Sequence, residues 1–79
     1  MVVLKIIVWV RLQNVPIPFW HHKAQEEIGN ILGKFRYMDH ERTEKGLFTF
    51  ARICVEINLN KDLPKHVEIK HKTIQWDIN

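Results

Sequence analysis

Residues 45–59, "KGLFTFARICVEINL", alternate in a way that predicts a long β-strand with two different faces. Successive side chains of a strand point to opposite faces of the sheet. One face is expected to cover a core and holds Leu47, Thr49, Ala51, Ile53, Val55, Ile57 and Leu59. The other face begins with Phe48, Phe50 and Arg52 and ends in polar residues, a pattern typical of a strand that is covered on one side only. We therefore expect function on this open face.

The N-terminal residues 4–12, "LKIIVWVRL", repeat the same division, with Trp9 and Arg11 on the open side. Pro16 and Pro18 then end the strand, because proline lacks an amide donor and restricts the residue before it. Apolar residues at helical spacing predict a helix from about Phe19 to Leu32, with Gly33 as its C-terminal cap.

Residues 34–39 predict a second strand, followed by an exposed loop over 40–46. A turn around Pro64 precedes residues 67–78, which offer two short alternating segments hinged near His71. The expected fold class is α+β: an antiparallel sheet with one main helix on its back. The expected core consists of Val8, Val10, Leu12, Ala24, Ile28, Ile31, Ile53, Val55 and Ile57.

Length and composition limit the class of protein. The 79 residues predict a single small domain over 1–79, as in a fragment of a longer protein, and the net charge of +3 mildly favours anionic partners. The apolar N-terminus is too short to span a bilayer. Cys54 is the one cysteine, which excludes an intramolecular disulfide and favours an intracellular location, nuclear or cytoplasmic.

Two stretches resemble a plant domain family of unknown function that occurs in LINE-type retrotransposon proteins, commonly ahead of a CCHC zinc knuckle. These are "VWVRLQNVPIPFW" (8–20), with "IGNILGK" (28–34) after it, and "FARICVEINLNKDLP" (50–64). The resemblance implies an α+β sandwich of the ferredoxin-like type, similar to the RNA-recognition motif, in which the second helix is reduced or absent. It also implies that the domain binds nucleic acid. No cysteine follows Cys54, so zinc binding is not carried over.

The expected site residues are Trp9, Arg11, Phe48, Phe50 and Arg52. Their rings offer stacking surfaces to unpaired bases, and the guanidinium groups can pair with phosphates, so the partner would be single-stranded RNA or DNA. Three alternatives stay open. The rings can instead pack beneath the segment that contains Trp76 or against a second copy in a homodimer, and the arginines can be solvated or pair with Glu56. The domain can also be a protein–protein interaction or self-association module that uses the same face or an exposed edge of the sheet.

Other classes of function find no support in the sequence. The five histidines lack zinc-type spacing, and no phosphate loop, nucleophile motif or carboxylate pair is present. We therefore expect no catalytic residues, no metal, no cofactor, no small-molecule substrate and no membrane association. Phe19 and Trp20 are expected to pack the helix onto the sheet.

Overall fold

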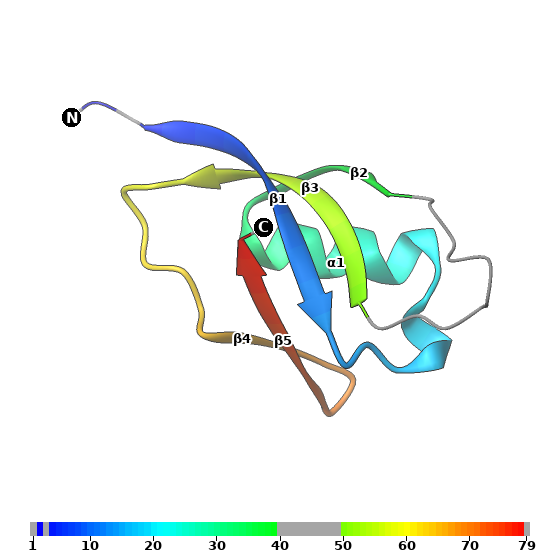
Figure 1. The fold of residues 1–79 in the computed structure, drawn as a ribbon. Helices are drawn as coiled ribbons and strands as arrows, with labels where there is room; N and C mark the ends of the chain where they lie inside the picture. Colours follow the sequence, from blue (N-terminus) through cyan, green and yellow to red (C-terminus); the bar gives the residue numbers. More distant parts are fainter. Residues whose placement is uncertain (1, 3, 40–49, 79) are drawn as a thin grey trace.

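One helix covers one face of a five-stranded antiparallel sheet (Figure 1). The computed structural model describes residues 2, 4–39 and 50–78, with the exception of the Phe50 side chain. The elements in chain order are β1 Lys5–Gln13, the 3₁₀-helix η1 Ile17–Phe19, α1 His22–Leu32, β2 Lys34–Met38, β3 Phe50–Asn58, β4 His66–Ile69 and β5 Lys72–Ile78. The strand order across the sheet is β2-β3-β1-β5-β4, which confirms the small α+β class.

The two central strands, β1 and β3, form the core face that their alternation predicts. They pair along their full length, from Lys5 opposite Asn58 to Gln13 opposite Phe50. Residues directly opposite each other in an antiparallel pair share a face. The helix side of these strands is fully buried at Val10, Leu12, Ile53, Val55 and Ile57.

Helix α1 begins and ends at identifiable caps. The Nδ1 atom of His21 accepts a hydrogen bond from the Ala24 amide at 3.3 Å, and Gly33 forms the C-terminal cap. Before the helix, Phe19 is buried, and the indole of Trp20 donates to the Val15 carbonyl oxygen at 2.7 Å while its ring packs against the core. The two aromatic residues therefore dock the start of the helix, as the sequence predicts.

The buried face of α1 differs from the expected one at Ile31, which is 49% exposed. The helix packs on the sheet through Ala24, Gln25, Ile28, Gly29 and Leu32. Gly29 lets this side of the helix approach the sheet closely. A Cβ atom at residue 29 would lie 2.8 Å from the Phe35 ring, closer than side chains normally pack. The assignment of Ile31 to the core is wrong, since the close approach at a glycine, and not hydrophobicity, decides which side faces the sheet.

Gly33 brings the end of α1 against β3. A Cβ atom at this position would overlap the carbonyl oxygen of Glu56, so only glycine permits the approach. Its backbone is extended, with φ near 177°, so the requirement is steric and not conformational. The chain passes directly from this contact into β2.

The C-terminal hairpin confirms the hinge near His71. Lys70 and His71 both have positive φ, 48° and 66°, which is the geometry of a two-residue hairpin turn. Val67 pairs with Ile74 on the helix side, and both are fully buried. The segment 59–65 between β3 and β4 contains no helix. Residues 4–39 and 50–78 thus form five strands, one α-helix and one 3₁₀-helix, and the canonical topology of the RNA-recognition motif is not shown.

The expected loop 40–46 and the first strand residues, 45–49, lie outside the described residues. Within the described part of the chain, no helix is long and apolar enough to cross a membrane.

Candidate nucleic-acid interface

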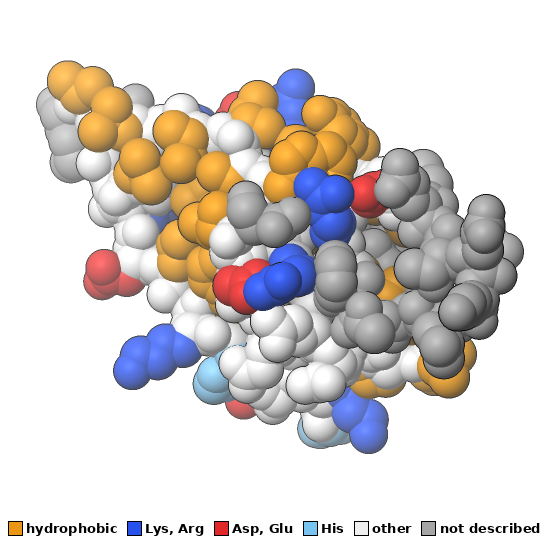
Figure 2. Space-filling view, in the orientation of Figure 1, with side chains coloured by type: hydrophobic (Ala, Val, Ile, Leu, Met, Phe, Trp, Pro, Cys, Tyr) orange, Lys and Arg blue, Asp and Glu red, His pale blue; other side chains and the backbone are white. Residues whose placement is uncertain are grey.

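The sheet face opposite α1 presents its side chains in rows across the strands. Figure 1 places α1 behind the sheet, so Figure 2 views this open face. The pairing registers define five rows across β1. They contain Gln13 with Phe50 and Gln75; Arg11 with Arg52 and Asp77; Trp9 with Cys54 and Tyr37; Ile7 with Glu56 and Lys34; and Lys5 with Asn58. In Figure 2, hydrophobic side chains gather over the N-terminal half of β1, and an acidic and a basic side chain lie together near the centre.

Arg11 is held by Asp77 of β5. Its Nε and Nη2 atoms donate to the two carboxylate oxygens at 3.0 and 2.6 Å, and Gln13 adds a third hydrogen bond at 3.0 Å. Hydrogen bonding from Arg11 lowers the pKa of Asp77, and the same pair raises the pKa of Arg11. The charge of Arg11 is therefore balanced within the sheet.

Arg52 is held by Asp39, directly after β2, at 3.3 Å. Arg52 also lies directly opposite Arg11, an arrangement that would destabilise the strand pair without counter-charges. Asp77 and Asp39 supply these counter-charges from the two sides. The alternative that Glu56 pairs with these arginines is wrong, because Glu56 lies two rows away.

Trp9 and Tyr37 form an aromatic pair on the open face. Their ring centroids are 5.5 Å apart at an interplanar angle of 71°, an edge-to-face contact. The Arg52 guanidinium lies 4.9 Å from the Trp9 centroid, within the range of a cation–π interaction. Trp9 is partly buried, whereas Tyr37 is 55% exposed, so Tyr37 is the more accessible ring.

Tyr37 was not among the site residues expected from the sequence, and a β-bulge explains why. Strict alternation would place Phe35 and Tyr37 on the same face. The register of β2 shifts between them, so Phe35 pairs with Val55 on the core side while Tyr37 pairs with Cys54 on the open side. Hydrogen bonding to Cys54 raises the pKa of Tyr37.

The remaining expected site residues are less completely defined. The backbone of Phe50 pairs with Gln13, a position on the open side, but its side chain lies outside the described residues, as does Phe48. Trp76 pairs with Leu12 on the helix side, and its indole donates to the Pro64 carbonyl oxygen at 2.9 Å. Trp76 therefore does not cover Trp9, and for Trp9 that packing alternative is wrong.

Three exposed cations lie toward one end of the open face: Arg36 directly precedes Tyr37, Lys34 lies one row from it, and Lys5 lies two rows from Trp9. Within the described residues, none of them has a carboxylate within ion-pair distance. Arg36 opposes the rise in the pKa of Tyr37, so its charge acts directly on that ring. These side chains, and not the balanced arginines, give the border of the face its positive charge.

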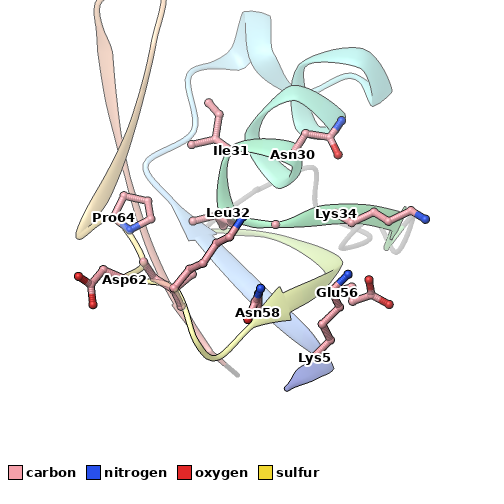
Figure 3. Close-up of a pocket in the computed structure, with 12 residues that line it drawn as sticks. Lys5, Asn30, Ile31, Leu32, Lys34, Glu56, Asn58, Asp62 and Pro64 are labelled. Carbon is pink, nitrogen blue, oxygen red and sulfur yellow. The ribbon is translucent and has the colours of Figure 1, made fainter. Parts of the chain in front are cut away.

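A hollow of about 370 Å³ adjoins this border at the end of α1 (Figure 3). Its charged lining mixes Lys5, Lys34 and Lys61 with Glu56 and Asp62. The C-terminal carbonyl groups of a helix also carry partial negative charge. This mixture favours no one class of ligand, so the hollow does not define a separate site.

Three of the five histidines have structural partners, and His40 lies outside the described residues. His22 lies 3.5 Å from Glu26, and His66 lies 3.3 Å from Glu68, while His21 caps α1. Among residues 4–39 and 50–78, no three His, Cys, Asp or Glu side chains gather in a group that could hold a metal ion.

Comparison of the chain with protein-family models, with curated proteins and with solved structures finds no match in any of the three. The open face must therefore be interpreted from its own chemistry.

Proposed function

We propose that the protein is a non-catalytic module that binds single-stranded RNA or DNA weakly through the open face of its sheet. The observation that carries the proposal is the Trp9–Tyr37 pair, which lies on the side away from α1 with one ring half exposed. Phe48, Phe50, Arg11 and Arg52 belong to the same proposed surface.

Stacking supplies most of the proposed affinity. Every base offers a π-face to an aromatic ring, so stacking tolerates any sequence and contributes about 1–3 kcal/mol per base. Tyr37 offers the accessible ring, while Arg52 fixes Trp9 from one side. A platform held in this way needs little reordering when a base binds.

In this proposal, the exposed cations Lys5, Lys34 and Arg36 make the contacts with phosphate groups. Asp77 and Asp39 already balance the charges of Arg11 and Arg52, so we assign these arginines to orienting the platform and to hydrogen bonding. Lys5, Lys34 and Arg36 remain to neutralise phosphates, since ion pairing with carboxylates does not engage them within the described residues. Few such contacts mean modest affinity.

The proposed origin follows the resemblance to the retrotransposon-related family. The element order β-α-β-β and the central position of β1 and β3 support an RNA-recognition-motif-like ancestry. The fifth strand and the helix-free segment 59–65 depart from that motif. In this proposal, the C-terminal hairpin takes the place of the second helix and extends the sheet beside β1.

Replacing Tyr37 tests the platform directly. Tyr37→Ala should weaken binding of a mixed-sequence, fluorescein-labelled single strand by about 1–3 kcal/mol in fluorescence anisotropy, because one stacked ring is lost. The exposure of Tyr37 predicts that the variant stays folded. Ile31→Ala is the matched control, since Ile31 is similarly exposed on α1 and should bind as the parent does.

The same titrations at several salt concentrations show how many cationic side chains contact phosphates, and whether Lys34 is one of them. Two or three phosphate contacts predict a slope of log K against log salt of roughly −1.4 to −2.1 for a single strand. Lys34→Gln should reduce the magnitude of this slope by about 0.7, the effect of one phosphate contact.

The outcome of the Tyr37 replacement decides the stacking proposal. Equal binding of the single strand by the parent and by Tyr37→Ala would reject the stacking platform.

A further inference from the structure

The open face has cations near β2 and hydrogen-bond acceptors near β5. Lys34 and Arg36 belong to β2 at one side of the sheet, and Lys5 begins β1. Asp77 lies on β5, on the other side of β1, and Gln13 lies diagonally across from it. Because phosphates are attracted to the cations and repelled by the carboxylate, a bound strand should keep its backbone near β2 and turn its bases toward β5.

Asp77 sets the orientation of the Gln13 side chain. The amide nitrogen of Gln13, Nε2, donates to Asp77 Oδ2 at 3.0 Å. A carboxylate only accepts hydrogen bonds, so the amide group turns its NH2 toward Asp77 and its carbonyl oxygen, Oε1, away from it. Arg11 holds the carboxylate in turn with two hydrogen bonds, and the Asp77 side chain is still 40% exposed. The two residues thus present a fixed set of acceptor oxygens on the open face.

These acceptors lie beside the proposed stacking platform. Asp77 stands opposite Arg11, one row from Trp9, and Gln13 lies one row further along β1. Adjacent rows are two residues apart along a strand, or about 7 Å. The pairing of β1 with β5 covers Val10–Gln13, so both acceptors project from the face of paired strands. The base next to the stacked one therefore meets Asp77 and Gln13 with its edge.

We propose that Asp77 and Gln13 read the edge of one base and prefer guanine, an inference that rests on the proposed binding of single strands by the open face. Guanine has two neighbouring donors on its Watson–Crick edge, at N1 and at the 2-amino group. Adenine, cytosine, uracil and thymine instead place an acceptor beside their donor there, and an acceptor-rich site repels it. Hydrogen bonds to an ionised carboxylate are also stronger than those between neutral groups.

Replacing one base of the ligand tests the preference without altering the protein. The probe is a short, fluorescein-labelled oligothymidylate whose central nucleotide is thymidine, deoxyguanosine, deoxyadenosine or deoxyinosine, and its binding is followed by fluorescence anisotropy. Deoxyguanosine should tighten binding about tenfold relative to thymidine, the effect of one well-formed pair of hydrogen bonds to a base. Deoxyinosine lacks only the 2-amino group of deoxyguanosine and should lose most of this gain. Equal binding of the guanine and inosine strands, or tighter binding of the adenine strand, would overturn the proposal.

Two glutamine variants test the assignment to Gln13. Gln13→Leu removes the acceptor and leaves the Arg11–Asp77 pair in place, so it should reduce the preference for guanine severalfold while the thymidine strand binds as it does to the parent. Gln75→Leu is the matched control, because Gln75 is exposed opposite Gln13 and carries the same amide, but Asp77 does not bond to it. Circular dichroism checks that both variants are folded. An unchanged preference in Gln13→Leu, or an equal loss in both variants, would contradict the assignment.

This inference and the proposed function fail in different ways. If all four strands bind the parent equally and Tyr37→Ala weakens each of them, the stacking platform stands and the guanine preference is wrong. If no strand binds the parent, the proposed function is wrong, and the preference for guanine is rejected with it.

Discussion

Asp77 shows how single residues set the character of the open face. Its carboxylate accepts two hydrogen bonds from Arg11 and one from Gln13, although Arg11 lies 66 residues away in the chain. Together with Asp39, it converts two facing arginines into a row without excess charge. The positive charge that an anionic partner would meet is thereby moved to the border of the face.

The Arg11–Asp77 pair predicts a pH dependence of stability. The pKa of Asp77 is lower in the folded state than its ordinary value, so the folded state releases this proton more readily. The stabilisation is present above the ordinary carboxyl pKa, about 3.9, and is lost as the pH falls through the lowered value. Urea unfolding of the parent and Asp77→Asn should differ most above pH ~4 and converge below it. A difference that stays constant down to acidic pH would contradict this.

At the scale of the elements, alternation predicted β1 and β3 and their two faces, because a strand of period two exposes its pattern directly in the sequence. The pattern failed where backbone geometry intervened. The bulge in β2 moved Tyr37 to the open face, and the close approach at Gly29 turned Ile31 outward and Gln25 inward. The pairing of Arg11 with Asp77 depends on which strands become neighbours, and local patterns do not carry that information.

Replacing each of the two glycines of α1 and its cap by alanine compares a close contact with backbone, at Gly33, with a close contact with a side chain, at Gly29. Gly33→Ala should lower the free energy of unfolding by about 1–3 kcal/mol, because its Cβ atom meets the backbone of β3, which cannot move aside without disturbing the sheet. Gly29→Ala meets the Phe35 side chain instead and gains about 1 kcal/mol in helix propensity, so it should be far less damaging. Denaturant unfolding compares the two variants. Equal losses would show that the approach at Gly33 is not the tighter constraint.

In the molecule as a whole, the two sides of the sheet carry different kinds of side chain. Helix α1 and the core occupy one side, while the other presents the Trp9–Tyr37 pair with its bordering cations (Figure 2). The N-terminal half of β1 extends beyond the last pair with β5 (Figure 1).

An NMR titration of the isotopically labelled protein with a mixed-sequence single-stranded oligonucleotide tests whether the open face binds nucleic acid. We expect the Trp9 indole signal and the amide signals around Trp9, Tyr37 and Arg52 to shift with increasing oligonucleotide, while those of α1 stay in place. Shifts confined to the helix side, or no shifts at all at millimolar oligonucleotide, would contradict it.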